Sequence, residues 1–502
     1  MGVLALAATA RAEVVVLKNG KEVRGKIVSQ TDKTVEVKVK QHGITMTRSF
    51  QRTAIASVLK DDQPGVEKVD TAADQNDGRK DRRTESPRRR SKPAAARSKS
   101  RKKQKPPAER STDDAASDSG CVVKSRRVMP ANPQFVSKTS HGRLEMIGQG
   151  DERIRLVTVW GTPFQRGQAQ GELLRKEVAS HTSRLIELMM KVEVLDEVYA
   201  ATKPHTPAYF IEELKGLADG SGIPLQQIVR ANLIGEAGEW HCSLFGAWGK
   251  ATKADGHVYQ LRALDYAVRA EIQRHPAIIV HVPEKGHPFA NIGWAGVVGA
   301  VSGISSEAIA ISEIGDRYDK ENDTFDGQPF MYMLRDILQF DKSLEAAIDR
   351  VRRTPRTTSL MYAIGDGKFG QVRALQTSHT LCNVYDPSNL EPLTDAHQRI
   401  PDVVYWGMSW DVPRYDGPLH DKLVEHYGHI NAKVTIEDIV TSVGTGNLQT
   451  VVYDLTAMRI WVANARAKGE QGPLEAYKRS FVEIDMKQVF DQAVRLATNQ
   501  AL

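Results

Sequence analysis

The sequence predicts a layered α+β protein of 502 residues, in which a small β-barrel and a disordered basic linker precede one large globular domain. Three observations lead to this prediction. Residues 13–60 alternate apolar and polar side chains with a period of two. Residues 61–128 contain almost no large apolar side chains. From residue 129 to residue 502, strand-like runs and clusters of helices follow one another without the regular βα alternation of a doubly wound sheet.

Residues 1–12 are interpreted as a truncated signal peptide. A short apolar stretch ends in Ala10-Arg11-Ala12, which is the small-residue pattern of a cleavage site, although no Lys or Arg precedes the apolar stretch. The alternative is a frayed N-terminus. We therefore expect an exported protein, periplasmic or extracellular. No apolar run approaches the roughly 18–20 residues that a membrane-spanning helix needs.

Residues 13–60 predict a small SH3-like or Sm-like barrel. Asn19-Gly20 is a strong hairpin signal, and further turn signals divide the segment into short alternating runs. The expected strands are 13–17, 23–28, 35–39, 44–48 and 54–59. Barrels of this size more often bind or pack than catalyse, so the segment predicts a binding module whose ligand stays open.

Residues 61–128 predict a disordered linker with a concentrated positive charge. Residues 79–110 hold 15 Lys and Arg against 3 Asp and Glu, whereas the whole chain carries a net charge of +7. The remaining chain is therefore slightly acidic. The segment is either a solvated tether or a site that attracts an anionic polymer or surface. It lacks interleaved aromatic residues for base stacking, so we expect no sequence-specific binding of nucleic acid.

The three cysteines, Cys121, Cys242 and Cys382, form no CxxC motif and indicate neither a disulfide framework nor a structural zinc site. The acidic segment 316–327 departs from the spacing of an EF-hand loop, and the histidines at 275, 281 and 287 are a weak zinc pattern. No dinucleotide fingerprint or phosphate loop occurs. We expect no metal and no cofactor.

Cys242 is the candidate nucleophile. It begins a predicted strand that Asp255-Gly256 joins to a return strand carrying Arg262 and Asp265. Charged residues in an otherwise apolar strand need partners, and an Arg beside a thiol stabilises the thiolate. The plain alternatives are a small buried hydrophobic cysteine and a structural Arg–Asp pair.

This hairpin resembles that of the N-terminal-nucleophile (Ntn) hydrolases. More narrowly, the chain resembles the acyl-coenzyme A:6-aminopenicillanic acid acyltransferase family and its cysteine relatives, the choloylglycine hydrolases and phospholipase B-like proteins. The likeness spans roughly residues 140–465. Besides Cys242 with Arg262-x-Leu-Asp265, the matching motifs are 161–171, 212–220, 299–313 and 447–463.

The resemblance implies a four-layer αββα sandwich and a self-processing enzyme. The Cys242 thiol would attack the carbonyl of His241, so that the chain is cut into residues 129–241 and 242–502 of this domain. The new α-amino group would then accept the thiol proton, and Cys242 would form an acyl-enzyme with an amide or ester substrate. Arg262 would stabilise the thiolate, and Asp265 would accept a hydrogen bond from the ammonium or a neighbouring donor.

One feature departs from the family pattern. Relatives often place an Asn after the strand that here reads 310–315, and no Asn stands there. The oxyanion would need backbone N–H groups or another side chain, for which Asn383 and Asn389 are candidates. The alternative function is therefore a catalytically inactive, envelope-associated binding protein that uses the barrel and the basic linker.

Overall fold

The computed structural model describes residues 13–17, 22–31, 34–41, 44–52, 55–60, 127–188, 192–237, 241–316, 320–390, 397–407 and 415–499. The expected signal peptide at 1–12 and residues 61–126 of the expected linker lie outside these ranges. The chain divides into two compact units, 1–39 with 47–122 and 40–46 with 123–502. We describe the two units separately.

The five expected strands lie between Glu13 and Lys60. They are β1 (Glu13–Leu17), β2 (Glu22–Gln30), β3 (Thr34–Gln41), β4 (Ile44–Gln51) and β5 (Ile55–Lys60), in the sheet order β4-β3-β2-β1-β5. Val15, Val35 and Val37 are buried, as the period-two pattern requires. Closure of this sheet into a barrel stays a prediction.

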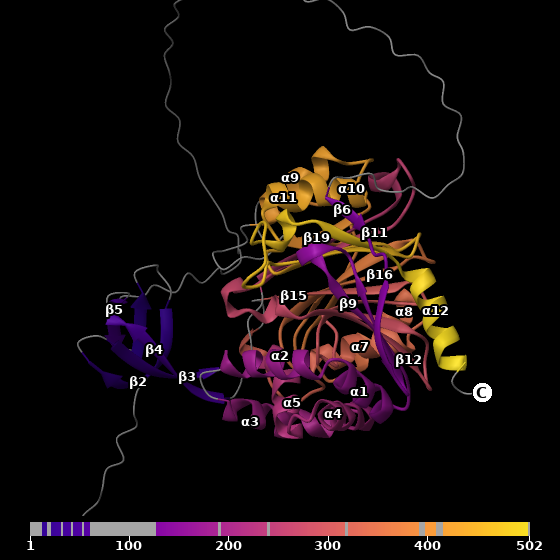
Figure 1. Cartoon of the computed structure of the whole chain (residues 1–502). Helices are drawn as coiled ribbons and strands as arrows, with labels where there is room; N and C mark the ends of the chain where they lie inside the picture. Colours follow the sequence, from indigo (N-terminus) through magenta and orange to yellow (C-terminus); the bar gives the residue numbers. More distant parts are fainter. Residues whose placement is uncertain are drawn as a thin grey trace, which may run out of the picture. The chain divides into compact units, whose positions relative to one another are not determined.

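The larger unit contains two sheets and groups of helices, which confirms the expected mixed α/β fold (Figure 1). The seven-stranded sheet has the order β19-β10-β11-β20-β21-β22-β6. Its strands are β6 (Val128–Pro130), β10 (His241–Ala247), β11 (Tyr259–Asp265), β19 (Val403–Gly407), β20 (Gln449–Asp454), β21 (Arg459–Asn464) and β22 (Phe481–Asp485).

The ten-stranded sheet has the order β18-β17-β16-β15-β14-β13-β12-β9-β8-β7. Its strands are β7 (Gln134–Thr139), β8 (Gly142–Ile147), β9 (Ile154–Gly161), β12 (Pro276–Pro283), β13 (Phe289–Trp294), β14 (Ser302–Ser305), β15 (Ile309–Gly315), β16 (Leu360–Asp366), β17 (Gln371–Thr377) and β18 (Cys382–Tyr385). The parallel pairs β9–β12 and β6–β22 join strands from the two sides of Cys242.

Groups of helices cover the outer faces of the two sheets. The helices are α1 (Pro163–Leu173), α2 (Arg175–Glu187), α3 (Glu193–Thr202), α4 (Ala208–Ser221), α5 (Leu225–Asn232), α6 (Ile234–Ala237), α7 (Phe330–Phe340), α8 (Leu344–Arg353), α9 (Asp416–Glu425), α10 (Ala432–Val434), α11 (Val440–Val443) and α12 (Met486–Asn499). Helix α12 instead packs against the core that both sheets share. In Figure 1, α1–α5 lie on one side of the sheets and α9–α11 on the other.

Strand alternation divides the core into layers. On β12, Ile278 and Val280 join a cluster that holds apolar side chains of both sheets, whereas Ala277 and Ile279 pack under the helices. On β10 and β11, Phe245 and Leu261 pack against α9 and α11 in a further cluster. Each sheet therefore buries both faces, which explains why its strands lack simple apolar–polar alternation.

Helices α1 and α4 pack with their backbones in close contact through glycines. A Cβ added at Gly167 would collide with the Glu213 carbonyl oxygen, and one at Gly216 would collide with the Phe164 carbonyl oxygen. Gly171 and Gly220 leave equally little room one turn further along each helix. The sequence predicts one helix over 167–195, but α1 ends at Leu173 and α2 begins at Arg175.

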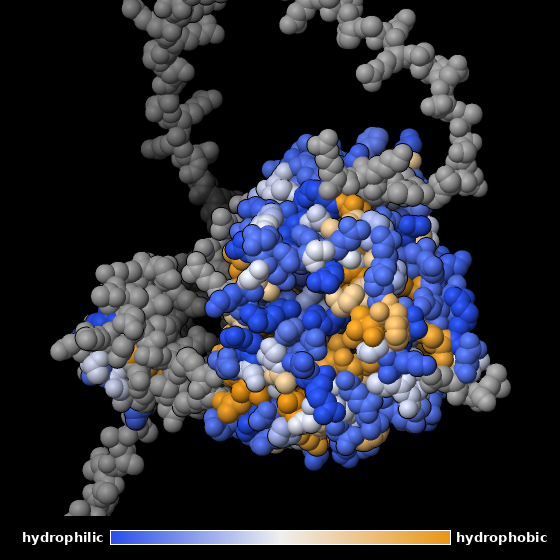
Figure 2. Space-filling model, viewed as in Figure 1, coloured by the Kyte–Doolittle hydropathy of each residue, from blue (hydrophilic) through white to orange (hydrophobic). Residues whose placement is uncertain are grey.

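The surface of the larger unit is mostly hydrophilic with scattered hydrophobic patches on the face shown (Figure 2). Among the helices of the described residues, none has the length and the apolar composition to cross a bilayer.

Candidate active site

Cys242 lies near the start of β10, opposite β11. The antiparallel register pairs Cys242 with Leu264, His241 with Asp265, and Leu244 with Arg262. Because side chains on a strand alternate and cross-strand partners share a face, Cys242 and Arg262 belong to the face toward the other sheet. The pairing of β10 with β11 therefore places the thiol and the guanidinium on one face of the sheet.

Arg262 forms a fully buried ion pair with Glu313 of β15. Its Nε donates to the Glu313 carbonyl oxygen at 3.0 Å, and its Nη2 donates to the Glu313 Oε2 at 3.1 Å. Among the described residues, neither the Arg262 Nη1 nor the Glu313 Oε1 has a hydrogen-bond partner. Burial raises the pKa of the Glu313 carboxyl although the guanidinium opposes this. Sequence reasoning missed Glu313, because it comes from the other sheet.

Asp265 organises the loop at 445–447. Its carboxylate accepts hydrogen bonds from the Thr445 Oγ1 at 2.8 Å, the Gly446 N–H at 3.0 Å and the Asn447 N–H at 2.9 Å. Burial raises the pKa of Asp265 to about 6, and these hydrogen bonds oppose the rise. The Asp265 carboxylate therefore has its own partners and is not held as the simple Arg262–Asp265 pair that the sequence allowed.

Asn447 is the second residue that sequence reasoning missed. Its Oδ1 accepts from the Tyr266 N–H at 2.9 Å, directly after the Asp265 that pairs with His241. This bond fixes the orientation of the Asn447 amide at the end of β11. The other candidates have different surroundings, since Asn383 donates to the Tyr385 hydroxyl and Asn389 accepts from the Asp386 N–H.

The environment of Cys242 keeps its thiol protonated in the intact chain. The side chain is fully buried, and this burial raises the pKa of the thiol. The Arg262 guanidinium opposes the rise, whereas the carboxylates of Glu313 and Asp265 add to it. The Asp265 N–H donates a hydrogen bond to the sulfur. The thiol therefore lies among charged groups and is not ionised.

A narrow cavity of about 50 Å³ reaches Arg262 and Leu264, the register partner of Cys242. Its lining is mostly apolar and comes from α2, α5, α6, β12, β13 and the loop that follows β13. This loop is fixed by buried amides. The Asn232 Oδ1 accepts from the Val298 N–H at 2.7 Å, and the Asn291 Nδ2 donates to the Val298 carbonyl oxygen at 3.2 Å.

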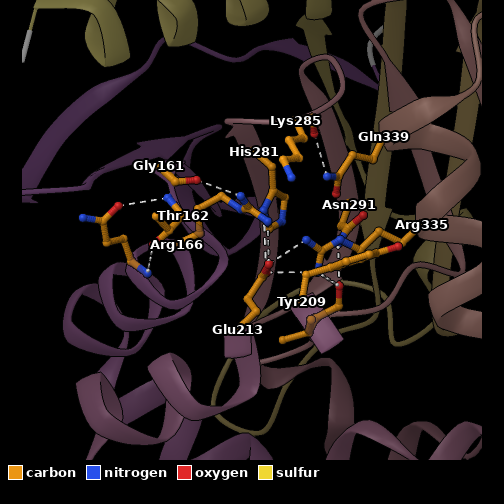
Figure 3. Close-up of polar contacts among 12 residues, drawn as sticks. Gly161, Thr162, Arg166, Tyr209, Glu213, His281, Lys285, Asn291, Arg335 and Gln339 are labelled. Atoms are coloured by element: carbon orange, nitrogen blue, oxygen red, sulfur yellow. Dashed lines mark hydrogen bonds and ion pairs between the residues drawn. The ribbon is translucent and has the colours of Figure 1, made fainter. Parts of the chain in front are cut away.

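A buried charge cluster supports the same loop (Figure 3). Glu213 of α4 accepts hydrogen bonds from Arg166 of α1 at 2.9 Å and from both Nη atoms of Arg335 of α7, at 3.0 and 2.6 Å. The Arg335 Nη1 also donates to the Val298 carbonyl oxygen at 3.0 Å. Arg166 and Glu213 lie in the motifs 161–171 and 212–220, and neither motif indicates this pairing.

Two further groups of titratable side chains among the described residues have partners within the protein. His281 lies 3.8 Å from Glu213 within the charge cluster, and its burial lowers its pKa well below the usual range. Glu425, His426 and Asp438 lie close enough to share an ion, but the Lys422 Nζ already contacts both carboxylates at 2.9 Å.

No family model matches the chain. Protein dcd1B of Dictyostelium discoideum is 28% identical over 401 residues, which cover 72% of this chain and 79% of that protein. The N-acylethanolamine-hydrolyzing acid amidase of Oryctolagus cuniculus is 26% identical over 167 residues, or 32% of this chain and 45% of that protein. A solved structure of the Caenorhabditis elegans ortholog of N-acylethanolamine-hydrolyzing acid amidase matches 43% of this chain and 93% of that chain, with 16% identity and a TM-score of 0.33.

Protein dcd1A of Dictyostelium discoideum is 30% identical over 428 residues, which cover 76% of this chain and 96% of that protein. The match extends over nearly the whole length of that relative. The chain belongs to the family of protein dcd1A.

Proposed function

We propose that the protein is a self-processing cysteine hydrolase or acyltransferase of the Ntn class, which acts on amide-linked or ester-linked acyl groups. The observation that carries the proposal is that Cys242 shares a strand face with Arg262, which pairs with Glu313 and lines an apolar cavity. Two sheets packed face to face, with helices on their outer faces, support the four-layer αββα assignment. The sequence likeness to an acid amidase supports the reaction class.

The first step is cleavage before Cys242. The sulfur attacks the His241 carbonyl carbon, the peptide C–N bond breaks, and the nitrogen of Cys242 takes up a proton. Water then hydrolyses the thioester, which leaves a carboxylate on His241 and a free thiol and α-amino group on Cys242. Asp265 is the register partner of His241 and holds the 445–447 loop beside this bond.

The second step uses the new terminus. An α-amino group has a pKa of about 7.7–8.0, so it accepts the thiol proton near neutral pH without a separate histidine. The sulfur attacks the substrate carbonyl, the leaving amine takes the proton, and water or an acceptor amine resolves the acyl-enzyme. Arg262 stabilises the thiolate, and the Asn447 Nδ2 is the candidate donor to the oxyanion.

The test compares the purified full-length protein with two cysteine variants. We expect the wild type to yield a fragment that begins at Cys242, as N-terminal sequencing detects, and to hydrolyse acyl amides. Cys242→Ala stays uncut and inactive, whereas Cys382→Ala, which removes a partly buried cysteine of β18, is cut and active. An uncut wild type without Cys242-dependent turnover would overturn the proposal and favour the binding-protein alternative.

We also propose that the protein is exported and that residues 79–110 attract an anionic polymer or surface. Both rest on sequence patterns in segments outside the described residues.

A further inference from the structure

The wall of the cavity beside Arg262 contains polar side chains that are almost fully buried. His181 of α2, Asn291 of β13 and Trp294 of β13 are 3%, 4% and 7% exposed. All three line the cavity together with apolar residues such as Leu185 and Ile279. A ligand made only of hydrocarbon groups would leave the polar atoms of these side chains without hydrogen-bond partners.

Several of their polar atoms have no hydrogen-bond partner among the described residues. These atoms are both ring nitrogens of His181, the Nε1 of Trp294 and the Oδ1 of Asn291. Buried polar groups in native proteins are nearly always paired with protein, water or ligand, because leaving them unpaired costs free energy. Their concentration around one cavity indicates a polar group that enters with the ligand.

The hydrogen-bond donors and acceptors of these three side chains indicate which polar group the ligand carries. Burial and the neighbouring His275 lower the pKa of His181 to about 3, so its ring is neutral and offers one donor and one acceptor. Trp294 offers only a donor, and the free Asn291 Oδ1 only accepts. The His181 and Trp294 rings stack with centroids 6.2 Å apart, so the two side chains are neighbours in the cavity wall. A hydroxyl group accepts from both donors and donates to one of the two acceptors, so it pairs three of these four atoms.

The volume of the cavity limits the size of the ligand. A space of about 50 Å³ holds roughly four water-sized groups, at about 10–15 Å³ each. That space suits a slim aliphatic chain and excludes a fused ring system. Arg262 and Leu264, the register partner of Cys242, form part of the same wall, so we expect the carbonyl end of a bound chain to lie at this end of the cavity.

We propose that the cavity binds the acyl part of the substrate and selects a short aliphatic acyl chain that carries a hydroxyl group, which His181 and Trp294 recognise. This inference rests on the proposed function. It assigns His181 and Trp294 as specificity-determining residues for the acyl group, separate from the groups at Cys242.

The test uses coumarin amides of butanoic, hexanoic and octanoic acids and of their 3-hydroxy counterparts. We expect the wild type to show a kcat/KM at least tenfold higher for hydroxylated chains. His181→Phe keeps a ring against Trp294 and removes both nitrogens, so it should abolish this preference and raise the Tm of the empty protein. Trp294→Phe, which removes the indole N–H, should weaken the preference.

The matched control is His287→Phe. His287 is also a buried histidine, 7% exposed, but it does not line this cavity. The substitution should leave the hydroxyl preference unchanged. A binding measurement on the uncut Cys242→Ala variant adds a readout without turnover, in which 3-hydroxyhexanoate should bind at least tenfold more tightly than hexanoate.

The outcomes separate the two proposals. Cys242-dependent turnover with equal or better use of unsubstituted chains would overturn the inference, show that the cavity atoms bind only water, and leave the proposed function standing. A loss of preference in His287→Phe as large as in His181→Phe would also overturn it. Absence of cutting and turnover would overturn the proposed function, and the binding measurement would then decide the inference by itself.

Discussion

Replacing Glu213 by glutamine removes the only carboxylate that the described structure places between Arg166 and Arg335. The two guanidiniums are 2% and 0% exposed, so neither can recover hydration without local unfolding. Removing one partner of a buried ion pair typically costs about 3–5 kcal/mol, because the remaining charge stays buried without compensation. Since Glu213 serves two guanidiniums, we expect Glu213→Gln to lie in the upper part of that range.

The neighbouring residue supplies the control. Glu212 is about half exposed and pairs with Lys215 across one turn of α4 at 2.8 Å. Exposed pairs of this kind contribute about 0–1 kcal/mol. Urea unfolding followed by circular dichroism should therefore show a large loss of stability for Glu213→Gln and almost none for Glu212→Gln. Equal effects of the two substitutions would refute the reasoning.

The pH dependence of stability is a second test of the ion pairs of Glu213. Burial alone raises the pKa of Glu213, but Arg335 and Arg166 outweigh it and lower the pKa to about 2, from 4.5 for the free group. The folded state therefore favours the ionised carboxylate. Its stabilising contribution is complete above pH 4.5 and is lost as the pH falls toward 2. The stability difference between wild type and Glu213→Gln should narrow over that interval.

Three further predictions address the site, the helix packing and the linker. Asp265→Asn should slow self-cleavage and turnover by about 100-fold or more, because it disturbs the hydrogen bonds that hold Gly446 and Asn447, and a time course on gels measures this. Gly216→Ala should destabilise the protein by about 1–3 kcal/mol or prevent folding, whereas Gly293→Ala, whose Cβ meets nothing within 4 Å, should change the Tm little. Deletion of residues 79–110 should remove salt-sensitive binding to polyphosphate and leave cleavage at Cys242 unchanged, as co-sedimentation and gels would show.

The sequence predicted those parts of the site that local structure determines. The strands that carry Cys242 and Arg262 follow each other in the sequence with a turn signal between them, and they pair antiparallel as β10 and β11. The signal at Asp255-Gly256 does not set their register, because β10 ends at Ala247, Gly249–Thr252 is a 3-10 helix and β11 begins at Tyr259. The helices around 207–219 and 329–339 were also predictable, because their apolar periodicity and flanking proline or glycine signals are local.

The remaining parts depend on contacts between distant segments. Glu313 of one sheet pairs with Arg262 of the other sheet. Asn447 accepts a hydrogen bond from Tyr266, which lies 181 positions away in the chain. No periodic pattern marks either residue. The same holds for Arg335, which lies 122 positions from Glu213 in the chain.

The break between α1 and α2 at Leu174 was also beyond sequence reasoning. Neither proline nor glycine occurs at residues 172–176, and the periodic pattern continues across them. Leu174 is fully buried. Here tertiary packing, rather than a local stop signal, determines where the helix ends.

The most direct measurement is the intact mass of the purified full-length protein before and after incubation with an acyl amide. We expect two chains. The chain that begins at Cys242 should gain the mass of the acyl group and lose it again on treatment with hydroxylamine. A single uncut chain, or an acyl group carried by Cys382, would contradict the account.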